Sequence, residues 1–378
     1  MKIQIFIWIR IIYAVLGGLL IFVSPAESES VHTLEILSSP LTIDRIYRSM
    51  EGPTDNRVVT LTKDMHGEKK DIVWLLGLKT EILDAETNAP KSQEYLCHIT
   101  FASNKKILKS NAMLTDYMKY QYPKLLSLFQ SQTAMHFPKH FAMPALSTDD
   151  FFVVSMVLNN NEIPKKPFQL KVKDMVDYVY DRELNYKMNP LFRRSYILKV
   201  PVKGMSSASH CASEEGEGPK EDQLEQKTAE MAKASWEWLE KDADGNTLAT
   251  HWMVPPGRHI YRYRLPEGLE IPDDTTAHYI SAHLHAFGQY MAIRDLTTGK
   301  TVFKARVKNY KDRRGIAYSD YYSSEKGIVF RKDHRYELIC EYNNTTSQDV
   351  DAMAMMLVFY LDRTFDKKKL MELKNYKE

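Results

Sequence analysis

The stretch DVDAMAMMLVFYL, residues 349–361, is almost entirely apolar after its two aspartates. An apolar run of this length, with branched and aromatic side chains, is typical of a β-strand. Similar stretches recur earlier in the chain, and residues that favour turns separate them. They are DIVWLLGLKTEI (71–82), QEYLCHITF (93–101), DDFFVVSMVLNNN (149–161), FQLKVK (168–173), HWMVPPGRHIYRYRL (251–265), HYISAHLHAFGQYMAIRD (278–295), KTVFKARVKNY (300–310) and HRYELICEYNN (334–344). The sequence therefore predicts an all-β fold of two tandem antiparallel β-sandwich domains, jelly-roll-like in type.

A change in composition separates the two predicted domains. Strand-like stretches occupy residues 31–202, the N-terminal sandwich, and return within residues 236–378, the C-terminal sandwich. Between them, residues 203–235 are rich in Ser, Glu, Lys and Gly and nearly free of large apolar side chains. Such a composition buries too little apolar surface to order itself, so it predicts a low-complexity linker or a surface insertion.

The N-terminal segment has the pattern of a secretory signal. Lys2 and Arg10 precede the apolar run Ile11–Val23, and small residues follow up to Ala26. The run has thirteen residues, fewer than the roughly 20 that a membrane-spanning helix needs. We therefore expect residues 1–26 to be a signal peptide, the mature protein to be secreted or periplasmic, and no stable membrane anchor.

Charge and motif content exclude several functional classes. Lys and Arg number 51 against 49 Asp and Glu, so the net charge of +2 gives no reason to expect a nucleic-acid partner. Three cysteines, Cys97, Cys211 and Cys340, allow at most one internal disulfide. GxSxG, HExxH, P-loop and GxGxxG motifs are absent, so hydrolase and nucleotide-dependent activities lack candidate residues.

The segment HYISAHLHAFGQ, residues 278–289, contains three of the twelve histidines. Residues two apart in a strand point to the same side, roughly 7 Å apart, so His283 and His285 can converge on one metal ion. His278 has the opposite parity and joins them only if the strand bulges. On spacing alone, two half-buried histidines with ordinary hydrogen bonds are the preferred interpretation.

Three motifs together carry a family resemblance. HLHAFG has the form His-x-His-x-x-Gly, Asp351-Ala352-Met353 follows it, and WMVPPG (252–257) precedes both. This set resembles the C-terminal domain of the copper type II, ascorbate-dependent monooxygenases, the family of peptidylglycine alpha-hydroxylating monooxygenase and dopamine beta-monooxygenase. Other stretches resemble an uncharacterised, secreted bacterial branch of this fold.

The resemblance implies a copper site and an activity. His283, His285 and Met353 would bind the copper at which oxygen is activated, which makes residues 236–378 a copper-binding sandwich. Ascorbate or another small reductant would supply electrons, and a C–H bond of a small-molecule or peptide substrate would be hydroxylated. Thioether sulfur prefers Cu(I), and imidazole serves both oxidation states. Taken alone, Met353 and Met355 are ordinary core methionines; Met355, on the same strand face, is the alternative ligand.

The resemblance extends to the first half, where the family carries a second copper that supplies electrons. There the family has a His-His pair and a later histidine. This sequence has Cys97-His98 at the pair, and Met156 or Val157 at the later position. Cys97, His98 and Met156 are a possible second, soft copper site, and buried structural residues are the preferred interpretation.

The remaining histidines and functions leave several alternatives. We expect His251 and His259 to be solvated residues at strand ends, with a place near the metal as the alternative, and His136 and His140 to lie on the surface or in loops. Three functions compete: a copper-dependent monooxygenase, a non-catalytic copper-binding protein with a single His-His-Met site, and a metal-free double sandwich used for interactions.

Overall fold

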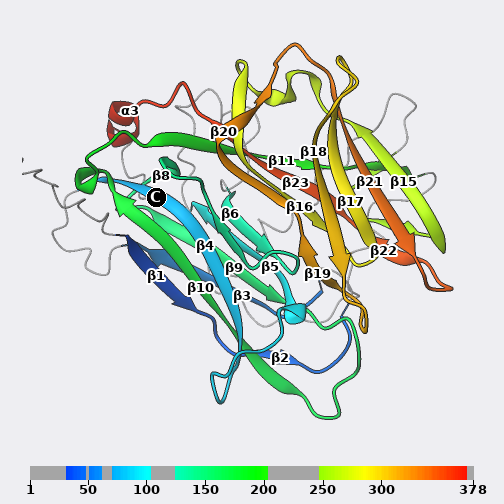
Figure 1. Cartoon of the computed structure of the whole chain (residues 1–378). Coiled ribbons are helices and arrows are strands. Elements are labelled where there is room, and N and C mark those ends of the chain that lie inside the picture. The colour runs from blue at the N-terminus through cyan, green and yellow to red at the C-terminus, as the bar shows by residue number, and fades with distance from the viewer. Residues whose placement is uncertain (1–30, 48–50, 62–69, 104–123, 203–246, 373–378) are drawn as a thin grey trace, which may run out of the picture.

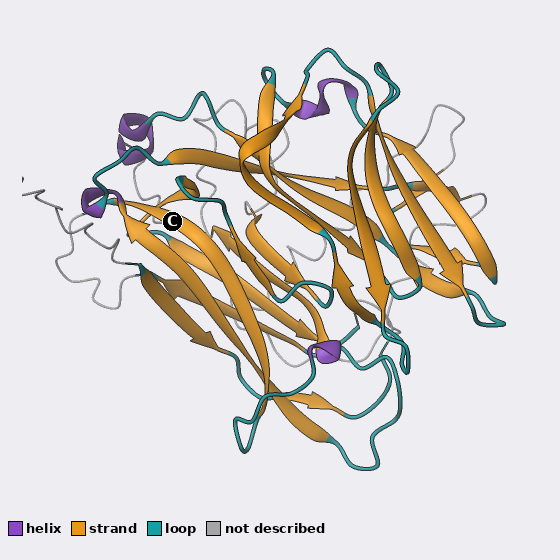
Figure 2. Ribbon diagram, in the orientation of Figure 1, coloured by secondary structure: helices purple, strands orange, loops and turns teal. Residues whose placement is uncertain are grey.

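A computed structural model of the chain consists almost entirely of β-strands (Figures 1 and 2). This confirms the predicted all-β sandwich class. Within the described part, no helix is long and apolar enough to cross a membrane. The predicted signal peptide (1–26) and the predicted linker or insertion (203–235) lie outside the described residues. The structure describes residues 31–47, 51–61, 70–103, 124–202 and 247–372.

The largest sheet has ten strands and includes segments from both halves of the chain. Its strands are β1 (His32–Leu37), β2 (Leu41–Ile43), β4 (Ile72–Asp84), β7 (Ala134–His136), β8 (Phe141–Leu146), β10 (Phe168–Tyr180), β11 (Asn189–Ile197), β16 (Thr275–Leu284), β20 (Tyr321–Phe330) and β23 (Ala354–Leu361). The order is β1-β10-β4-β8-β11-β23-β16-β20, with β2 beside β10 and β7 beside β4. The pairing of β8 with β11 is parallel and the other described pairings in this sheet are antiparallel.

Two further sheets flank the ten-stranded sheet. The first is formed by β3 (Thr54–Thr60), β9 (Asp150–Val157), β5 (Leu96–Ser103) and β6 (Lys124–Phe129), in that order. The second is formed by β15 (Gly257–Arg264), β21 (Tyr336–Asn344), β17 (Gly288–Asp295), β18 (Thr301–Asn309) and β19 (Ile316–Ser319). Short ribbons pair β12 (Val200–Val202) with β13 (Thr247–Ala249), and β14 (Trp252–Val254) with β22 (Val350–Ala352). The described helices are η1 (Gln93–Tyr95), η3 (Asp181–Glu183), η5 (Glu267–Glu270) and α3 (Lys367–Glu372).

Strand β23 is buried on both faces and serves two hydrophobic cores. Leu357 and Phe359 belong to the first core, which the four-stranded sheet and β4 and β10 also line. Met356, Val358 and Tyr360 belong to the second core, shared with the five-stranded sheet. Since alternate side chains of a strand point to opposite faces, burial of both faces requires an apolar residue at every position. This explains why residues 354–361 form a continuous apolar run rather than an alternating one.

The two sandwiches share this sheet rather than following one another as separate bodies. Phe192 and Tyr196 of β11, which precede residue 202, pack in the second core. Tyr279 of β16 packs in the first core. The division into residues 31–202 and 236–378 stays a prediction. The structure adds that β11 and β16 each contribute to the core of the other half.

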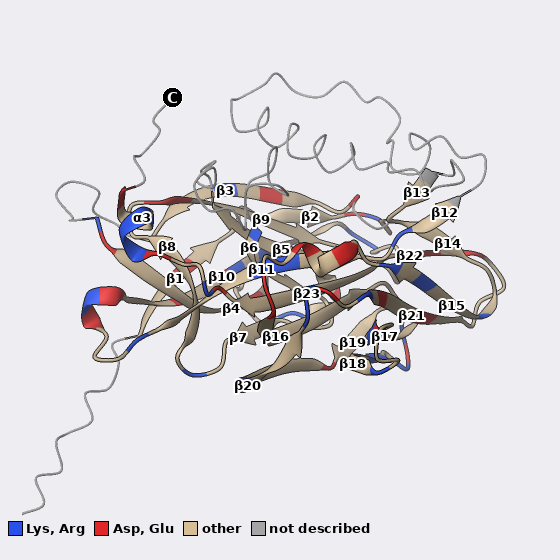
Figure 3. Ribbon diagram, turned by 90° about the horizontal axis from the view of Figure 1, so that it is seen from above, with Lys and Arg blue, Asp and Glu red and all other residues tan. Residues whose placement is uncertain are grey.

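Charged residues of both signs are interspersed along the described strands (Figure 3). Many form partly exposed pairs, such as Arg262 with Glu337 across β15 and β21 at 2.9 Å, and Arg306 of β18 with Asp320 at 2.9 Å. Exposed pairs of this kind add little to stability. Their mixture matches the net charge of +2 of the whole chain.

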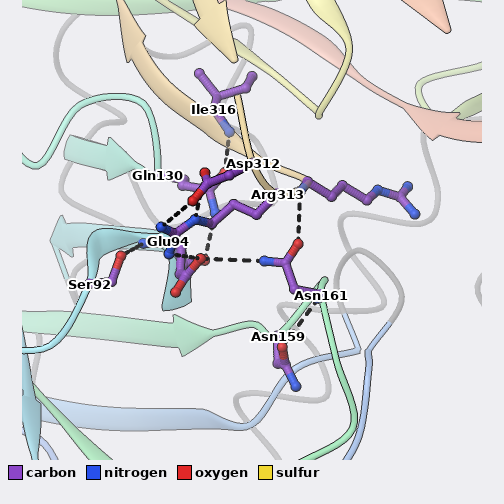
Figure 4. Close-up of polar contacts among 9 residues, drawn as sticks. Ser92, Glu94, Gln130, Asn159, Asn161, Asp312, Arg313 and Ile316 are labelled. Carbon is purple, nitrogen blue, oxygen red and sulfur yellow. Dashed lines mark hydrogen bonds and ion pairs between the residues drawn. The ribbon is translucent and has the colours of Figure 1, made fainter. Parts of the chain in front are cut away.

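The turn that joins β18 to β19 contacts the first sandwich directly (Figure 4). Arg313 Nη1 lies 3.0 Å from Glu94 Oε2. Gln130 bridges the halves: its Oε1 accepts from the backbone N of Ile316 at 2.7 Å, and its Nε2 donates to the backbone O of Glu94 at 2.6 Å. Gly315 permits this approach, because a Cβ there would lie 2.9 Å from Gln130 Oε1. The second sandwich is therefore fastened to the first by this turn as well as by the shared sheet.

The shared strand predicts that the two cores unfold together. Phe359→Ala opens a cavity in the first core and Met356→Ala opens one in the second, at costs of about 3–5 and 2–5 kcal/mol. We expect each variant to shift a single unfolding transition, followed by tryptophan fluorescence and circular dichroism in urea. Two separable transitions, with each variant affecting only one, would show that the cores are independent.

Candidate metal site

The predicted ligands His283, His285 and Met353 lie on neighbouring segments of the ten-stranded sheet. His283 is in β16 and pairs with Met355, and Leu284 pairs with Ala354. One residue further, the backbone N of His285 donates to the backbone O of Met353 at 3.3 Å. Opposite residues of an antiparallel pair point to the same side, so His285 and Met353 share the side that His283 and Met355 occupy.

Tyr342 holds the two ligand-bearing segments together. Its hydroxyl donates to the backbone O of Met353 at 2.6 Å and accepts from the backbone N of His285 at 3.1 Å. The side chain is fully buried, and burial raises its pKa well above the usual value, so the hydroxyl keeps its proton. The relative position of His285 and Met353 therefore depends on one buried hydroxyl.

The turn after His285 is fixed by side-chain and backbone hydrogen bonds. Phe287 has a φ of 73°, which is unusual for a residue with a side chain. Asn309 of β18 holds this turn, because its Oδ1 accepts from the Phe287 N and its Nδ2 donates to the Gly288 O, each at 2.8 Å. A Cβ on Gly288 would lie 2.9 Å from the Leu284 Cβ. The Gly of the HLHAFG motif is thus required by close packing beside the histidines.

Asp351 orients the imidazole of His285. His285 Nδ1 lies 2.8 Å from Asp351 Oδ2. Burial raises the pKa of Asp351, but the hydrogen bond to His285 and the nearby charges of His285, His251 and Arg314 together outweigh this effect, and the net shift is downward. The carboxylate therefore accepts the Nδ1 proton, which leaves the ring lone pair on Nε2, the arrangement commonly found for histidines that bind metals.

His283 is kept neutral and lies close to His285. Burial lowers its pKa well below the usual value, and the nearby imidazoles of His285, His98 and His251 lower it further. The ring centroids of His283 and His285 are 5.3 Å apart. Two imidazoles bound to one ion through nitrogens at about 2.0–2.1 Å have centroids about 5 Å apart at a tetrahedral angle. The spacing of this pair therefore fits a shared ion.

The methionines near this pair differ in their surroundings. Met356 is fully buried in the second core, and Met355 packs against the first. Met353 is half-buried and belongs to neither core as the described residues define them. Met353 thus stands between two strands without a packing role in a core, which favours it over Met355 as a sulfur donor.

The possible second site in the first half is also brought together. His98 pairs with Met156 across β5 and β9, and His98 Nδ1 lies 3.4 Å from Cys97 Sγ. Burial and nearby Lys124 lower the pKa of His98 to about 4. Both interpretations of Cys97, His98 and Met156, as structural residues and as a soft copper site, stay predictions.

The two candidate sites lie near each other. Phe129 pairs with His98 across β5 and β6, and its ring stacks on His283 with centroids 4.3 Å apart. His98 is also among the groups whose charge would lower the pKa of His283. The first and second sandwiches therefore meet at these histidines.

His278 is a satisfied buried histidine. The strand does bulge between Ala277 and Tyr279, as the alternative for His278 required. Its Nε2 lies 2.8 Å from Thr276 Oγ1, however, and its Nδ1 lies 3.0 Å from the Ser324 O. Both ring nitrogens have partners, so His278 offers no donor to the metal site.

The expectation that His251 is a solvated strand-end residue is wrong. Its ring lies beside His285, with centroids 5.5 Å apart, and its Nε2 is buried without a hydrogen-bond partner among the described residues. His259 and His136 bond to nearby backbone carbonyls, of Pro256 and Phe137, and His136 is exposed as expected. Sequence reasoning also gave no role to Tyr342 and Asp351, although Asp351 belongs to the Asp-x-Met motif.

The described side chains do not form a preformed cage. No group of three or more His, Cys, Asp or Glu residues within the described ranges is arranged to hold a metal ion. The candidate set therefore depends on the Met353 thioether and on side-chain rotation to close around an ion.

Comparisons with known proteins give no family assignment. No protein-family model matches the chain, and no curated protein matches it. Solved structures similar to it include the major capsid protein of STIV, with 8% identity, a TM-score of 0.32, and coverage of 88% of this chain and 96% of that one. The major capsid protein P2 of bacteriophage PM2 has 7% identity, a TM-score of 0.29, and coverage of 88% and 100%. Likenesses at this level carry no inference about function.

The bridging hydroxyl of Tyr342 generates a prediction. Tyr342→Phe leaves a buried amide and carbonyl less satisfied and should lower the free energy of unfolding by about 1–3 kcal/mol. The control is Tyr196→Phe, whose hydroxyl donates to the Leu269 O at 2.9 Å away from the histidines. We expect similar losses of stability from both variants, measured in urea, and weaker copper binding only in Tyr342→Phe. Equal copper affinity in both would show that the bridge does not position the ligands.

Proposed function

We propose that the protein binds copper through His283, His285 and Met353. The observation that carries this proposal is the Asp351–His285 hydrogen bond of 2.8 Å beside a second, neutral imidazole 5.3 Å away. A carboxylate that orients one ring and burial that keeps the other uncharged are the conditions that imidazole ligation needs. A thioether on the next segment adds a soft donor, which favours copper over zinc or magnesium.

The proposed activity is that of a copper-dependent monooxygenase, which hydroxylates a C–H bond with O2 and a small reductant such as ascorbate. The resemblance of HLHAFG and Asp351-Ala352-Met353 to that family supports it. Bound copper would supply oxygen activation and one-electron chemistry. The chain itself would position the donors through Tyr342, orient His285 through Asp351, and hold the site between the two sandwiches, where Phe129 covers one face of His283.

A non-catalytic copper-binding protein is the second candidate. The observation in its favour is the first half, where His98 is accompanied by Cys97 and Met156 in place of further histidines. If that set does not bind copper, one site remains, which suits sequestration or delivery. The two candidates share the same His-His-Met site and differ in electron supply.

We also propose a location and a class of partner for the protein. The signal-peptide pattern of residues 1–26 supports export, which gives a secreted or periplasmic protein. The mixed charges of the described strands support a small-molecule or peptide substrate rather than nucleic acid (Figure 3).

Copper titration tests the ligand set. The purified protein, stripped with a chelator, should bind Cu(II) with a type 2 electron paramagnetic resonance spectrum and bind Cu(I) in competition with a chromogenic chelator. His283→Ala and His285→Ala should abolish this binding. Met353→Leu should weaken Cu(I) more than Cu(II), because the thioether prefers the reduced ion. Met355→Leu is the matched control and should bind as the wild type does; the reverse pattern would make Met355 the ligand.

Reductant-dependent oxygen consumption separates the two candidate functions. A monooxygenase loaded with copper should consume O2 with ascorbate faster than free copper does, and His98→Ala should slow the reaction if the first half supplies electrons. Copper content per chain should then approach two. Copper binding near one per chain, with no oxygen consumption above that of the His283→Ala variant, would support the non-catalytic protein instead.

A further inference from the structure

We propose that His251 is an additional ligand of the metal ion at His283, His285 and Met353, which makes the site one of three imidazoles and one thioether. This inference rests on the proposed function, because it concerns the same ion. It assigns a role to a residue that the sequence favours as a solvated strand-end histidine, with a place near the metal as the alternative.

The pairing of β14 with β22 brings His251 to the site. Trp252 pairs with Ala352 and Met253 with Asp351. Continued by one residue, this register places His251 opposite Met353. Met353 in turn accepts from the His285 backbone on its other side. Three segments that are distant in sequence thus place His251, Met353 and His285 in one row.

The ring positions agree with the backbone pairing. The centroids of His251 and His285 are 5.5 Å apart, and those of His285 and His283 are 5.3 Å apart. Both distances are near the roughly 5 Å expected for two imidazoles on one ion. Because His251 and His283 both neighbour His285, rotation of their rings toward it would close the set.

The hydrogen bonding of His251 indicates an unmet need for a partner. Its Nδ1 is 3.4 Å from Thr250 Oγ1, a long contact, and its Nε2 is buried with no partner among the described residues. Buried polar atoms nearly always have partners, so an exception calls for an explanation such as an ion.

Charge also favours a cation at this position. The Asp351 carboxylate is hydrogen-bonded to His285, whose ring lies beside that of His251. Its negative charge would offset part of the charge of a cation held by these imidazoles and the thioether.

The test compares His251→Ala with His259→Ala, whose ring bonds to the Pro256 O outside the histidine row. Cu(I) affinity is measured by chelator competition, and the number of imidazole ligands by pulsed electron paramagnetic resonance of the Cu(II) form. We expect His251→Ala to weaken Cu(I) binding about 100-fold or more, since even partners outside the ligand shell contribute 10–100-fold. The imidazole count should fall from three to two, and His259→Ala should change neither.

A structural role for His251 is distinguished by the stability of the apo-protein. Because Nε2 has no partner among the described residues and the Nδ1 contact with Thr250 is long, His251→Met should nearly keep the urea midpoint of the wild-type apo-protein and retain part of the Cu(I) affinity. A large fall in the urea midpoint of His251→Met would overturn the inference. So would an imidazole count that stays at three in both His251→Ala and His251→Met. If the wild type binds no copper, the proposed function itself fails; if it binds copper and His251→Ala binds it equally well, only this inference fails.

Discussion

The burial of β23 on both faces is the constraint on which the rest of the molecule depends. Its odd-numbered residues pack in one core and its even-numbered residues in the other. A slip of one residue in its pairing would exchange the two sets, and it would also move Met353 away from His285. The alternation that builds two cores therefore fixes the register at the candidate metal site, so stability and the placement of the candidate ligands have the same origin.

The candidate site occupies the point where the chain changes sheets. β22 pairs with β14, and β23 pairs with β11 and β16, with Met353 between the two strands. A change of sheet interrupts the regular ladder, and the Met353 carbonyl is satisfied by the Tyr342 hydroxyl and the His285 amide. Because of this interruption, Met353 has no place in either core. Side chains from three segments can meet beside it.

The fold class and the shared side of His283 and His285 could be predicted from the sequence because their signals are local. Apolar runs and turns indicate strands, and the His-x-His spacing places His283 and His285 on one side. The shared sheet could not be predicted, since the tandem interpretation follows chain order and β11 and β23 are paired across more than 150 positions. His251 was assigned to solvent for the same reason: its place depends on the register of β14 with β22, about 100 positions away. The bulge at His278 could be considered from the sequence. Whether both ring nitrogens of His278 find hydrogen-bond partners depends on the folded structure.

The charges at the site bear on which oxidation state the protein would stabilise. His283 and His251 are held neutral by burial, and the Asp351 carboxylate is hydrogen-bonded to His285. The Arg314 guanidinium also acts on Asp351, so a bound Cu(II) would leave one more uncompensated positive charge at the site than a bound Cu(I). A buried net charge is costly in a medium of low dielectric constant, and the thioether also prefers the reduced ion. If the site binds copper as proposed, both effects act in the same direction and would favour Cu(I) as the resting ion, with a reductant as the natural partner of the site.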